Sequence, residues 1–199
     1  MHEDSPLQML TAQLTERDWA LWEGFLDRTR VTALRTEAEG LLAAGHFRAA
    51  GIGQEVRRRA DIRSDELLWI TPDAAPQAAS LLQSELEALR QAVNAATYLG
   101  LHEFEGHYAA YRAGASYARH LDRFRVDNRR VISMVLYLND AWTAVDGGEL
   151  RLYPDGTEAV TVLPRGGTLV CFLSERVPHE VLPARRLRLG LAGWFRRRA

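Results

Sequence analysis

Two histidines and one aspartate are the residues of this chain best suited to chemistry. His120 and Asp122 are separated by a single residue, and His179 lies far downstream. Because successive side chains of a strand point to opposite faces, His120 and Asp122 project to the same side. Two imidazoles and one carboxylate on one face of a metal ion leave the opposite face open. We therefore expect a metal site with free coordination positions.

A donor set of this composition is typical of non-haem Fe(II) oxygenases, whose open positions hold a co-substrate and O2. The His-x-Asp spacing alone is weak, because it also arises by chance when a surface histidine lies beside a solvated carboxylate. The order of these residues and their surroundings strengthen the metal-site prediction, because both histidines end β-rich runs and Arg188 follows His179 at strand spacing. A guanidinium beside a buried metal needs a carboxylate partner. The alternative is a surface arginine next to Arg185 and Arg186.

Composition limits the class of protein. The chain has 199 residues, 47% hydrophobic and 26% charged, which is ordinary for one globular domain. A net charge of −1 gives no overall field that would attract nucleic acid or an acidic membrane. No apolar run approaches the roughly 20 residues of a membrane-spanning helix. The start of the chain does not resemble a signal peptide. The single cysteine, Cys171, lies in an apolar run, so we expect a buried thiol and a cytoplasmic protein.

The first half of the chain is expected to supply supporting helices. Residues 1–14 are predicted to be a flexible arm, and residues 15–107 the helical support and substrate loop. Apolar residues at helical spacing predict three helices. The first follows a capping signature at Thr15, the second begins at Thr32, and the third begins at Pro76. Residues 66–70 are predicted to be a buried strand. His102 and His107 are five apart, off one helical face, so we do not expect them to bind metal.

The polar segment from His46 to Arg63 is the expected site of substrate recognition. Gly51 and Gly53 would allow it to close over an extended peptide. Its arginines at positions 57–59 form either an anion-binding patch or a solvated loop.

The second half, residues 108–199, reads as the catalytic core. Seven or so short strands are separated by turns rich in glycine and proline, a spacing typical of a sandwich or barrel. Residues 131–138 are apolar at nearly every position, as in a strand covered on both faces. We therefore predict an α+β fold with a double-stranded β-helix, or jelly-roll, core and N-terminal helices packed on one sheet. Residues 15–199 would form a single oxygenase domain.

Several motifs together resemble the catalytic core of prolyl 4-hydroxylases, and above all the hypoxia-inducible-factor prolyl hydroxylases and their bacterial relatives. These motifs are the segments 117–122, 135–139, 147–150 and 178–181, followed by Arg188 and Trp194. The segment 61–65 ahead of Trp69 is also similar. The resemblance covers roughly residues 30–195.

The resemblance implies a role for each site residue. His120, Asp122 and His179 would bind Fe(II), and Arg188 would pair with the distal carboxylate of 2-oxoglutarate. Two tyrosines would assist Arg188, and four further residues would form an apolar wall around the co-substrate. The tyrosines are Tyr137 and Tyr111, and the wall residues are Val135, Leu150, Val181 and Trp194. O2 would be the second co-substrate, with ascorbate in a supporting role.

The implied reaction is 4-hydroxylation of a prolyl residue in a protein or peptide, with release of succinate and CO2. Elongation factor Tu is the candidate substrate suggested by the bacterial members, and a monomer or weak dimer is expected. The chain departs from the animal enzymes at Ala192, where they have a threonine near the metal. Two alternatives remain: a hydroxylase of a small molecule such as a free amino acid, and a non-catalytic jelly-roll binding module.

Overall fold

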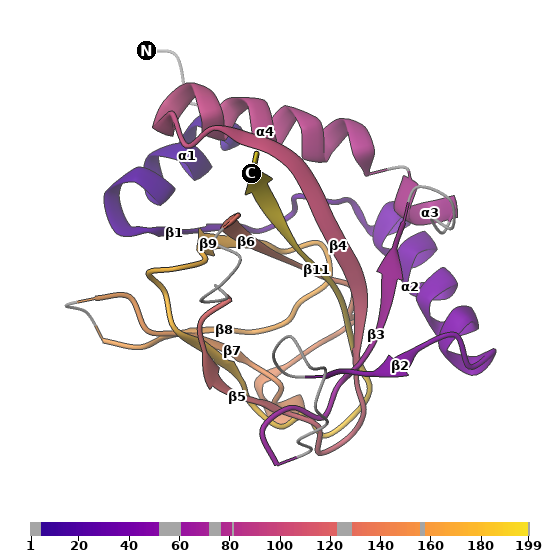
Figure 1. The fold of residues 1–199 in the computed structure, drawn as a ribbon. Helices are drawn as coiled ribbons and strands as arrows, with labels where there is room; N and C mark the ends of the chain where they lie inside the picture. Colours follow the sequence, from indigo (N-terminus) through magenta and orange to yellow (C-terminus); the bar gives the residue numbers. More distant parts are fainter. Residues whose placement is uncertain are drawn as a thin grey trace.

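The strands of this protein form two sheets that face each other. The computed structural model describes residues 5–51, 61–71, 77–80, 82–122, 129–155 and 158–198. Its strands are β1 (Trp19–Trp22), β2 (Arg48–Ala49), β3 (Glu66–Ile70), β4 (Leu101–Tyr111), β5 (Tyr117–His120), β6 (Arg130–Tyr137), β7 (Leu150–Leu152), β8 (Val160–Val162), β9 (Leu169–Leu173), β10 (His179–Val181) and β11 (Arg188–Arg197). The larger sheet has the order β1-β9-β6-β11-β4-β3-β2 and the smaller one the order β5-β10-β7-β8 (Figure 1). All pairings between these strands are antiparallel, as expected for a jelly roll.

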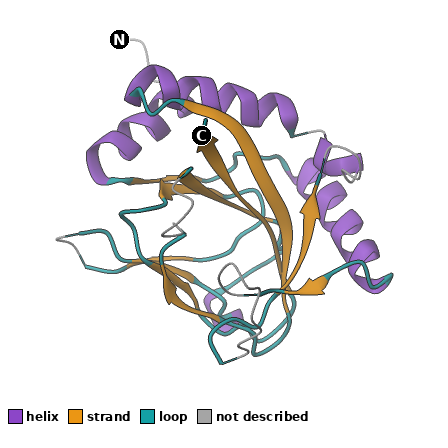
Figure 2. Ribbon diagram, in the orientation of Figure 1, coloured by secondary structure: helices purple, strands orange, loops and turns teal. Residues whose placement is uncertain are grey.

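The helices cover the side of the larger sheet that faces away from the smaller one (Figures 1 and 2). They are α1 (Pro6–Arg17), α2 (Arg28–Ala43), α3 (Gln77–Ser80) and α4 (Gln83–Thr97), with a short 3-10 turn, η1 (Ala144–Asp146), between β6 and β7. In α4 the buried residues Leu86, Leu89 and Val93 recur every three or four positions, so one face of this helix packs on the sheet. The predicted arrangement of supporting helices on one sheet is confirmed.

Two apolar clusters divide the interior between them. The first joins the helices to the outer face of the larger sheet, and the second fills the space between the two sheets. Strand β4 contributes to both, because alternate side chains point to opposite faces. Tyr108 and Ala110 belong to the first cluster, whereas Ala109 and Tyr111 belong to the second. The functional residues predicted on β4 and β11 therefore face the space between the sheets.

The N-terminal segment differs from the prediction of a flexible arm at residues 1–14. Within the described part, α1 already begins at Pro6, with Ser5 as its N-cap and Gln8 completing a capping box. Leu10 and Leu14 are 1% and 3% exposed. The helix forms because its apolar residues pack against the larger sheet, which a reading of local composition cannot reveal.

The helix predicted after the signature at Thr15 is also wrong. Helix α1 ends at Arg17, Asp18 takes a left-handed conformation with φ of 65°, and β1 follows at once. Strand β1 forms the edge of the larger sheet by pairing with β9. The capping signature at Thr15 thus lies at the end of helix α1, and the aromatic residues after it belong to the edge strand β1.

The expected boundary between residues 107 and 108 falls inside β4. Residues 101–107 pair with β11, and the first half of the chain supplies β1, β2, β3 and most of β4 to the larger sheet. The predicted strands 66–70 and 131–138 are confirmed as β3 and β6 within one residue. The predicted burial of the first strand is wrong, because no residue of β3 is fully buried and Trp69 is 41% exposed. The segment 46–63 is described only at its two ends, so its arginines at 57–59 lie outside the described residues.

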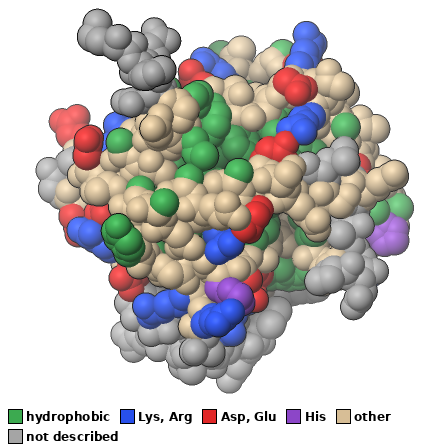
Figure 3. Space-filling model, turned by 90° about the horizontal axis from the view of Figure 1, so that it is seen from above, with side chains coloured by type: hydrophobic (Ala, Val, Ile, Leu, Met, Phe, Trp, Pro, Cys, Tyr) green, Lys and Arg blue, Asp and Glu red, His purple; other side chains and the backbone are tan. Residues whose placement is uncertain are grey.

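None of the described helices is long and apolar enough to cross a lipid bilayer. Acidic and basic side chains are intermixed over the face seen in Figure 3, in keeping with the net charge of −1.

Candidate metal centre and co-substrate cavity

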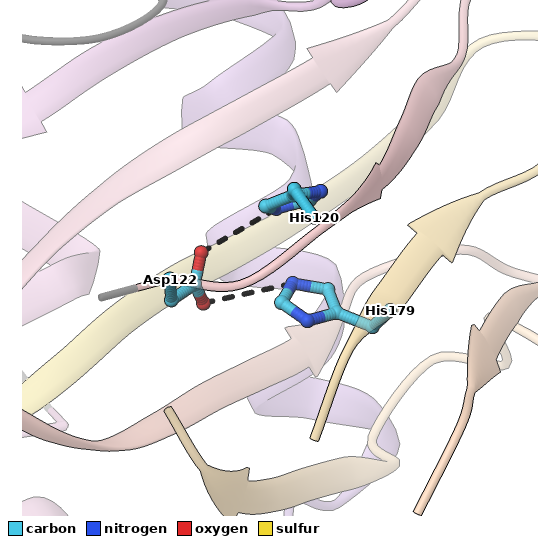
Figure 4. Close-up of side chains that lie close together, drawn as sticks. All are labelled: His120, Asp122 and His179. Carbon is cyan, nitrogen blue, oxygen red and sulfur yellow. Dashed lines mark ion pairs between the residues drawn. The ribbon is translucent and has the colours of Figure 1, made fainter. Parts of the chain in front are cut away.

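His120, Asp122 and His179 converge, although 56 residues separate the last two. His120 ends β5 and Asp122 follows that strand, while His179 begins β10, and the two histidines are opposite each other in the β5–β10 pairing. Their ligand atoms all lie within 4.8 Å of one another. The Nε2 atoms of His120 and His179 lie 3.4 and 3.6 Å from the two carboxylate oxygens of Asp122 (Figure 4). This is the donor set expected for a facial metal site.

Both imidazoles are held in one tautomer by the backbone. Nδ1 of His120 lies 2.8 Å from the carbonyl oxygen of Ala118, and Nδ1 of His179 lies 3.2 Å from that of Val177. A carbonyl oxygen can only accept, so Nδ1 carries the proton in each ring. The lone pair of each Nε2 is then free to bind a metal ion, an orientation that metal-binding histidines commonly receive from their surroundings.

The third ligand is fixed by a pair of buried hydroxyls that the sequence did not single out. Ser133 donates to Oδ2 of Asp122 at 2.7 Å, and Ser174 lies 2.9 Å from the Ser133 hydroxyl. Burial by itself would raise the pKa of Asp122, but the two histidines and Ser133 outweigh it and hold that pKa well below its usual range. Burial lowers the pKa of His179 to about 4. An anionic carboxylate with a neutral imidazole is the state that metal binding requires.

Arg188 lies at the deep end of a cavity of about 60 Å³ that also contains the three ligands. It is 2% exposed, and its Nε donates to the carbonyl oxygen of Gly148 at 2.8 Å. Its guanidinium lies 4.9 and 5.1 Å from the ring centroids of Tyr111 and Tyr137. No acidic side chain of the described residues pairs with it. A buried guanidinium without a carboxylate is costly, so the site fits an anionic ligand.

Tyr137 adds a second unsatisfied group beside Arg188. Its hydroxyl is buried without a hydrogen-bond partner among the described residues. Burial raises the pKa of Tyr137 to about 12, against the opposing effect of Arg188, so the phenol keeps its proton and can donate. Arg188 and Tyr137 together fit the distal carboxylate of a small dicarboxylic acid whose other end reaches the metal ligands.

Tyr137 is not one of the residues that line this cavity, but five other predicted site residues are. They are Tyr111, Val135, Leu150, Val181 and Trp194. Small residues, Ala109, Gly190 and Ala192, lie on β4 and β11 between Arg188 and the outer end, and they leave room for a co-substrate. The predicted roles of Tyr111 and the apolar wall are thus compatible with the geometry.

The structure explains why the second residue of the Gly147-Gly148 motif is a glycine. Gly148 has a φ of +70°, and a Cβ there would lie 3.0 Å from Cδ of Arg188. The glycine therefore allows Arg188 to lie against the backbone whose carbonyl it binds.

A larger groove of about 650 Å³ opens onto the metal ligands from outside. It shares six residues with the inner cavity, namely Arg63, His107, Tyr117, His120, Asp122 and Trp194. Tyr117 stacks on His120 with ring centroids 3.5 Å apart, and the guanidinium of Arg63 lies 4.5 Å from the Tyr117 ring. Arg63 forms two hydrogen bonds, of 2.6 and 2.9 Å, with Asp65. This Arg-x-Asp pair lies in the segment directly before β3, and the sequence alone did not indicate its role in the groove wall.

His102 and His107 do not belong to the cluster of potential metal ligands. Among the described residues, the one group of three or more potential ligands is the His120–Asp122–His179 cluster. His107 nevertheless lines both the inner cavity and the outer groove, a position the sequence alone did not indicate.

Comparison with known proteins identifies relatives of the same kind. Residues 106–196 match the 2OG-Fe(II) oxygenase superfamily. The chain is 32% identical to the hypoxia-inducible factor prolyl hydroxylase of Caenorhabditis elegans over 92% of its own length and 27% of that protein. It is 30% identical to human Egl nine homolog 1 over 87% of its own length and 42% of that protein. The chain thus spans less than half the length of these two relatives.

Two solved structures extend the likeness to the whole fold. A Pseudomonas putida prolyl-4-hydroxylase is 43% identical with a TM-score of 0.89, covering 97% of this chain and 100% of the other. A Trichoplax adhaerens prolyl hydroxylase, in complex with a hypoxia inducible factor oxygen degradation domain peptide fragment, is 28% identical with a TM-score of 0.88, covering 96% and 88%.

Proposed function

This chain belongs to the 2OG-Fe(II) oxygenase superfamily, and we propose that it acts there as a prolyl 4-hydroxylase of a protein or peptide. One observation carries the proposal: three converging metal ligands occupy a single cavity with a buried Arg188 that has no acidic partner among the described residues. Both the metal ligands and Arg188 are required for this conclusion, because the ligands alone would suit many metal enzymes. A buried guanidinium without an acidic partner among the described residues narrows the class of enzyme to metal enzymes that use an anionic co-substrate.

The chain's own residues have distinct tasks. His120 and His179 bind Fe(II) through Nε2 and Asp122 binds it through its carboxylate, while Arg188 and Tyr137 hold the distal carboxylate of 2-oxoglutarate. Once bound, Fe(II) and 2-oxoglutarate supply the oxidising power that places one oxygen atom of O2 on the substrate and the other on succinate, with release of CO2. Val135, Leu150 and Val181 surround this space with apolar side chains, which exclude water from the reaction.

The substrate class rests on the relatives and on the outer groove. The relative from Caenorhabditis elegans is named for the hypoxia-inducible factor, and the Trichoplax enzyme is bound to a peptide of that factor. The groove of about 650 Å³ is far larger than a free amino acid needs. Hydroxylation at C4, elongation factor Tu as substrate, a monomer or weak dimer, and a cytoplasmic location stay predictions. So does the recognition role of the segment 46–63.

The test is incubation of the protein with Fe(II), 2-oxoglutarate, O2 and ascorbate in a lysate of its own cells. We expect a new hydroxyproline in a polypeptide, gaining the mass of one oxygen atom, together with succinate. A mass gain on a free metabolite would support the small-molecule alternative instead. Absence of iron-dependent succinate release under every condition would leave only the binding module.

A further inference from the structure

His107 is a buried imidazole at the junction of the inner cavity and the outer groove. It lies on β4, opposite Ala192 of β11 and Trp69 of β3, and it is 2% exposed. It lines both spaces, beyond the small residues that separate it from Arg188. It is one of the six residues shared by the two spaces, so a substrate that enters by the groove comes close to this side chain.

The rings that pack around His107 are indoles. Its ring centroid lies 4.9 Å from that of Trp69 and 5.5 Å from that of Trp194, and the two indoles are 6.2 Å apart. Nδ1 of His107 and Nε1 of Trp194 are both buried without a hydrogen-bond partner among the described residues. Two unsatisfied ring nitrogens at neighbouring buried positions are unusual, because buried polar groups nearly always have hydrogen-bond partners. A bound ligand would satisfy them.

The imidazole is suited to a neutral partner. Burial lowers the pKa of His107 to about 3, with nearby Arg63 also disfavouring the charged form. A neutral imidazole offers one donor and one acceptor, and the Trp194 indole offers one donor. A peptide group has the same complement, one N–H donor and one carbonyl acceptor. Trp69, 41% exposed at the groove, adds an apolar surface for the side chains of such a ligand.

We propose that His107 is a specificity-determining residue for polypeptide substrates, and that its unpartnered nitrogen hydrogen-bonds a main-chain amide group next to the target prolyl. The proposal rests on the proposed function and names how the outer groove recognises its substrate. His107 binds the substrate in this account and takes no part in the reaction at the metal. Either tautomer leaves Nδ1 in need of a partner, so the bond forms with a substrate N–H or with a substrate carbonyl.

The test compares His107→Leu, which removes both nitrogens, with His107→Gln, which keeps a donor and an acceptor. His102→Leu is the matched control, because His102 is exposed on the same strand and lies outside the groove. The probe is a library of end-capped peptides with one central proline and random flanks, read by mass spectrometry for hydroxyproline. The peptide that the wild type hydroxylates best then serves for KM and kcat, and for anaerobic binding to the Fe(II)- and 2-oxoglutarate-loaded protein by tryptophan fluorescence.

We expect His107→Leu to raise the peptide KM and the peptide Kd by about tenfold, with kcat nearly constant, as for loss of one hydrogen bond to a buried group. His107→Gln should restore most of that affinity, and His102→Leu should match the wild type. An unchanged peptide Kd in His107→Leu overturns the proposal. Equal losses in Leu and Gln variants, with weakened 2-oxoglutarate binding, also overturn it, because they indicate a packing role. A wild type that consumes 2-oxoglutarate but hydroxylates no peptide overturns the proposed function itself, and this inference with it.

Discussion

The inner cavity and the outer groove share six residues, yet they are organised differently. In the inner cavity each metal ligand is fixed by a backbone carbonyl or a hydroxyl, and the sheets supply nearly every lining residue. In the outer groove the walls are mainly aromatic rings, arginines and leucines, and two ring nitrogens have no hydrogen-bond partner among the described residues. The difference suggests that the reaction centre is preorganised, whereas the groove is completed by its substrate. Four predictions test that comparison.

The largest effect is expected for His179→Ala. Removal of one of three ligands leaves two donors at a site that needs three, so Fe(II) binding and succinate formation should fall to background. Equilibrium dialysis with Fe(II) measures the first, and succinate release the second. His102→Ala, which changes an exposed histidine outside the cluster, should bind iron normally. An active His179→Ala variant would remove the metal assignment.

Arg188→Ala should separate the two ends of the inner cavity. Loss of the charged, forked partner should raise the KM for 2-oxoglutarate by about a hundredfold, while Fe(II) binding persists. Arg185→Ala is the control, because Arg185 is exposed three residues earlier. A 2-oxoglutarate KM equal in both variants would contradict the role of Arg188.

Asp65→Asn tests the wall of the outer groove through stability. The side chains of Arg63 and Asp65 are 14% and 0% exposed, so the change leaves a buried guanidinium without its counter-charge. We expect a loss of about 3 kcal/mol in the free energy of unfolding, measured with urea. Glu66→Gln, at the next residue, breaks the more exposed pair between Glu66 and Arg112 and should cost less than about 1 kcal/mol. Equal costs would mean that the groove wall is not held by the buried pair.

The smallest effect is expected for Ser133→Ala. Asp122 would lose the hydrogen bond that orients its carboxylate, and Fe(II) affinity should fall about tenfold with the fold intact. The comparison variant is Ser133→Thr, which keeps the hydroxyl. If Ser133→Ala binds Fe(II) as tightly as the wild type, the buried hydroxyls do not contribute to the preorganisation of the metal site.

The sequence predicted the reaction centre better than the groove. The His-x-Asp spacing predicts two ligands on the same side of the chain, and Arg188 follows His179 at strand spacing. Local geometry and motif order therefore led to the same residues that the structure brings together, although β5 ends at His120 and Asp122 lies just beyond it. Ser133 and Ser174 were not predicted, because their contact with Asp122 depends on three segments meeting in space.

The N-terminal region shows where local patterns fail. The apolar residues from Trp19 to Trp22 were read as a helix, but pairing with β9 at a sheet edge decides their structure. Likewise, the spacing of His102 and His107 along the chain allows a comparison only with a helical zinc motif. Its position in the wall follows from the pairing of β4 with β3 and β11, and no spacing along the chain encodes that register.

The most direct test is anaerobic titration of the Fe(II)-loaded protein with 2-oxoglutarate, followed by its visible charge-transfer absorption. The account predicts an absorption band that saturates at one co-substrate per chain, is absent in His179→Ala, and requires far more 2-oxoglutarate in Arg188→Ala. A wild type without the band, or variants that titrate like it, would contradict the claim that these residues share one metal and co-substrate site.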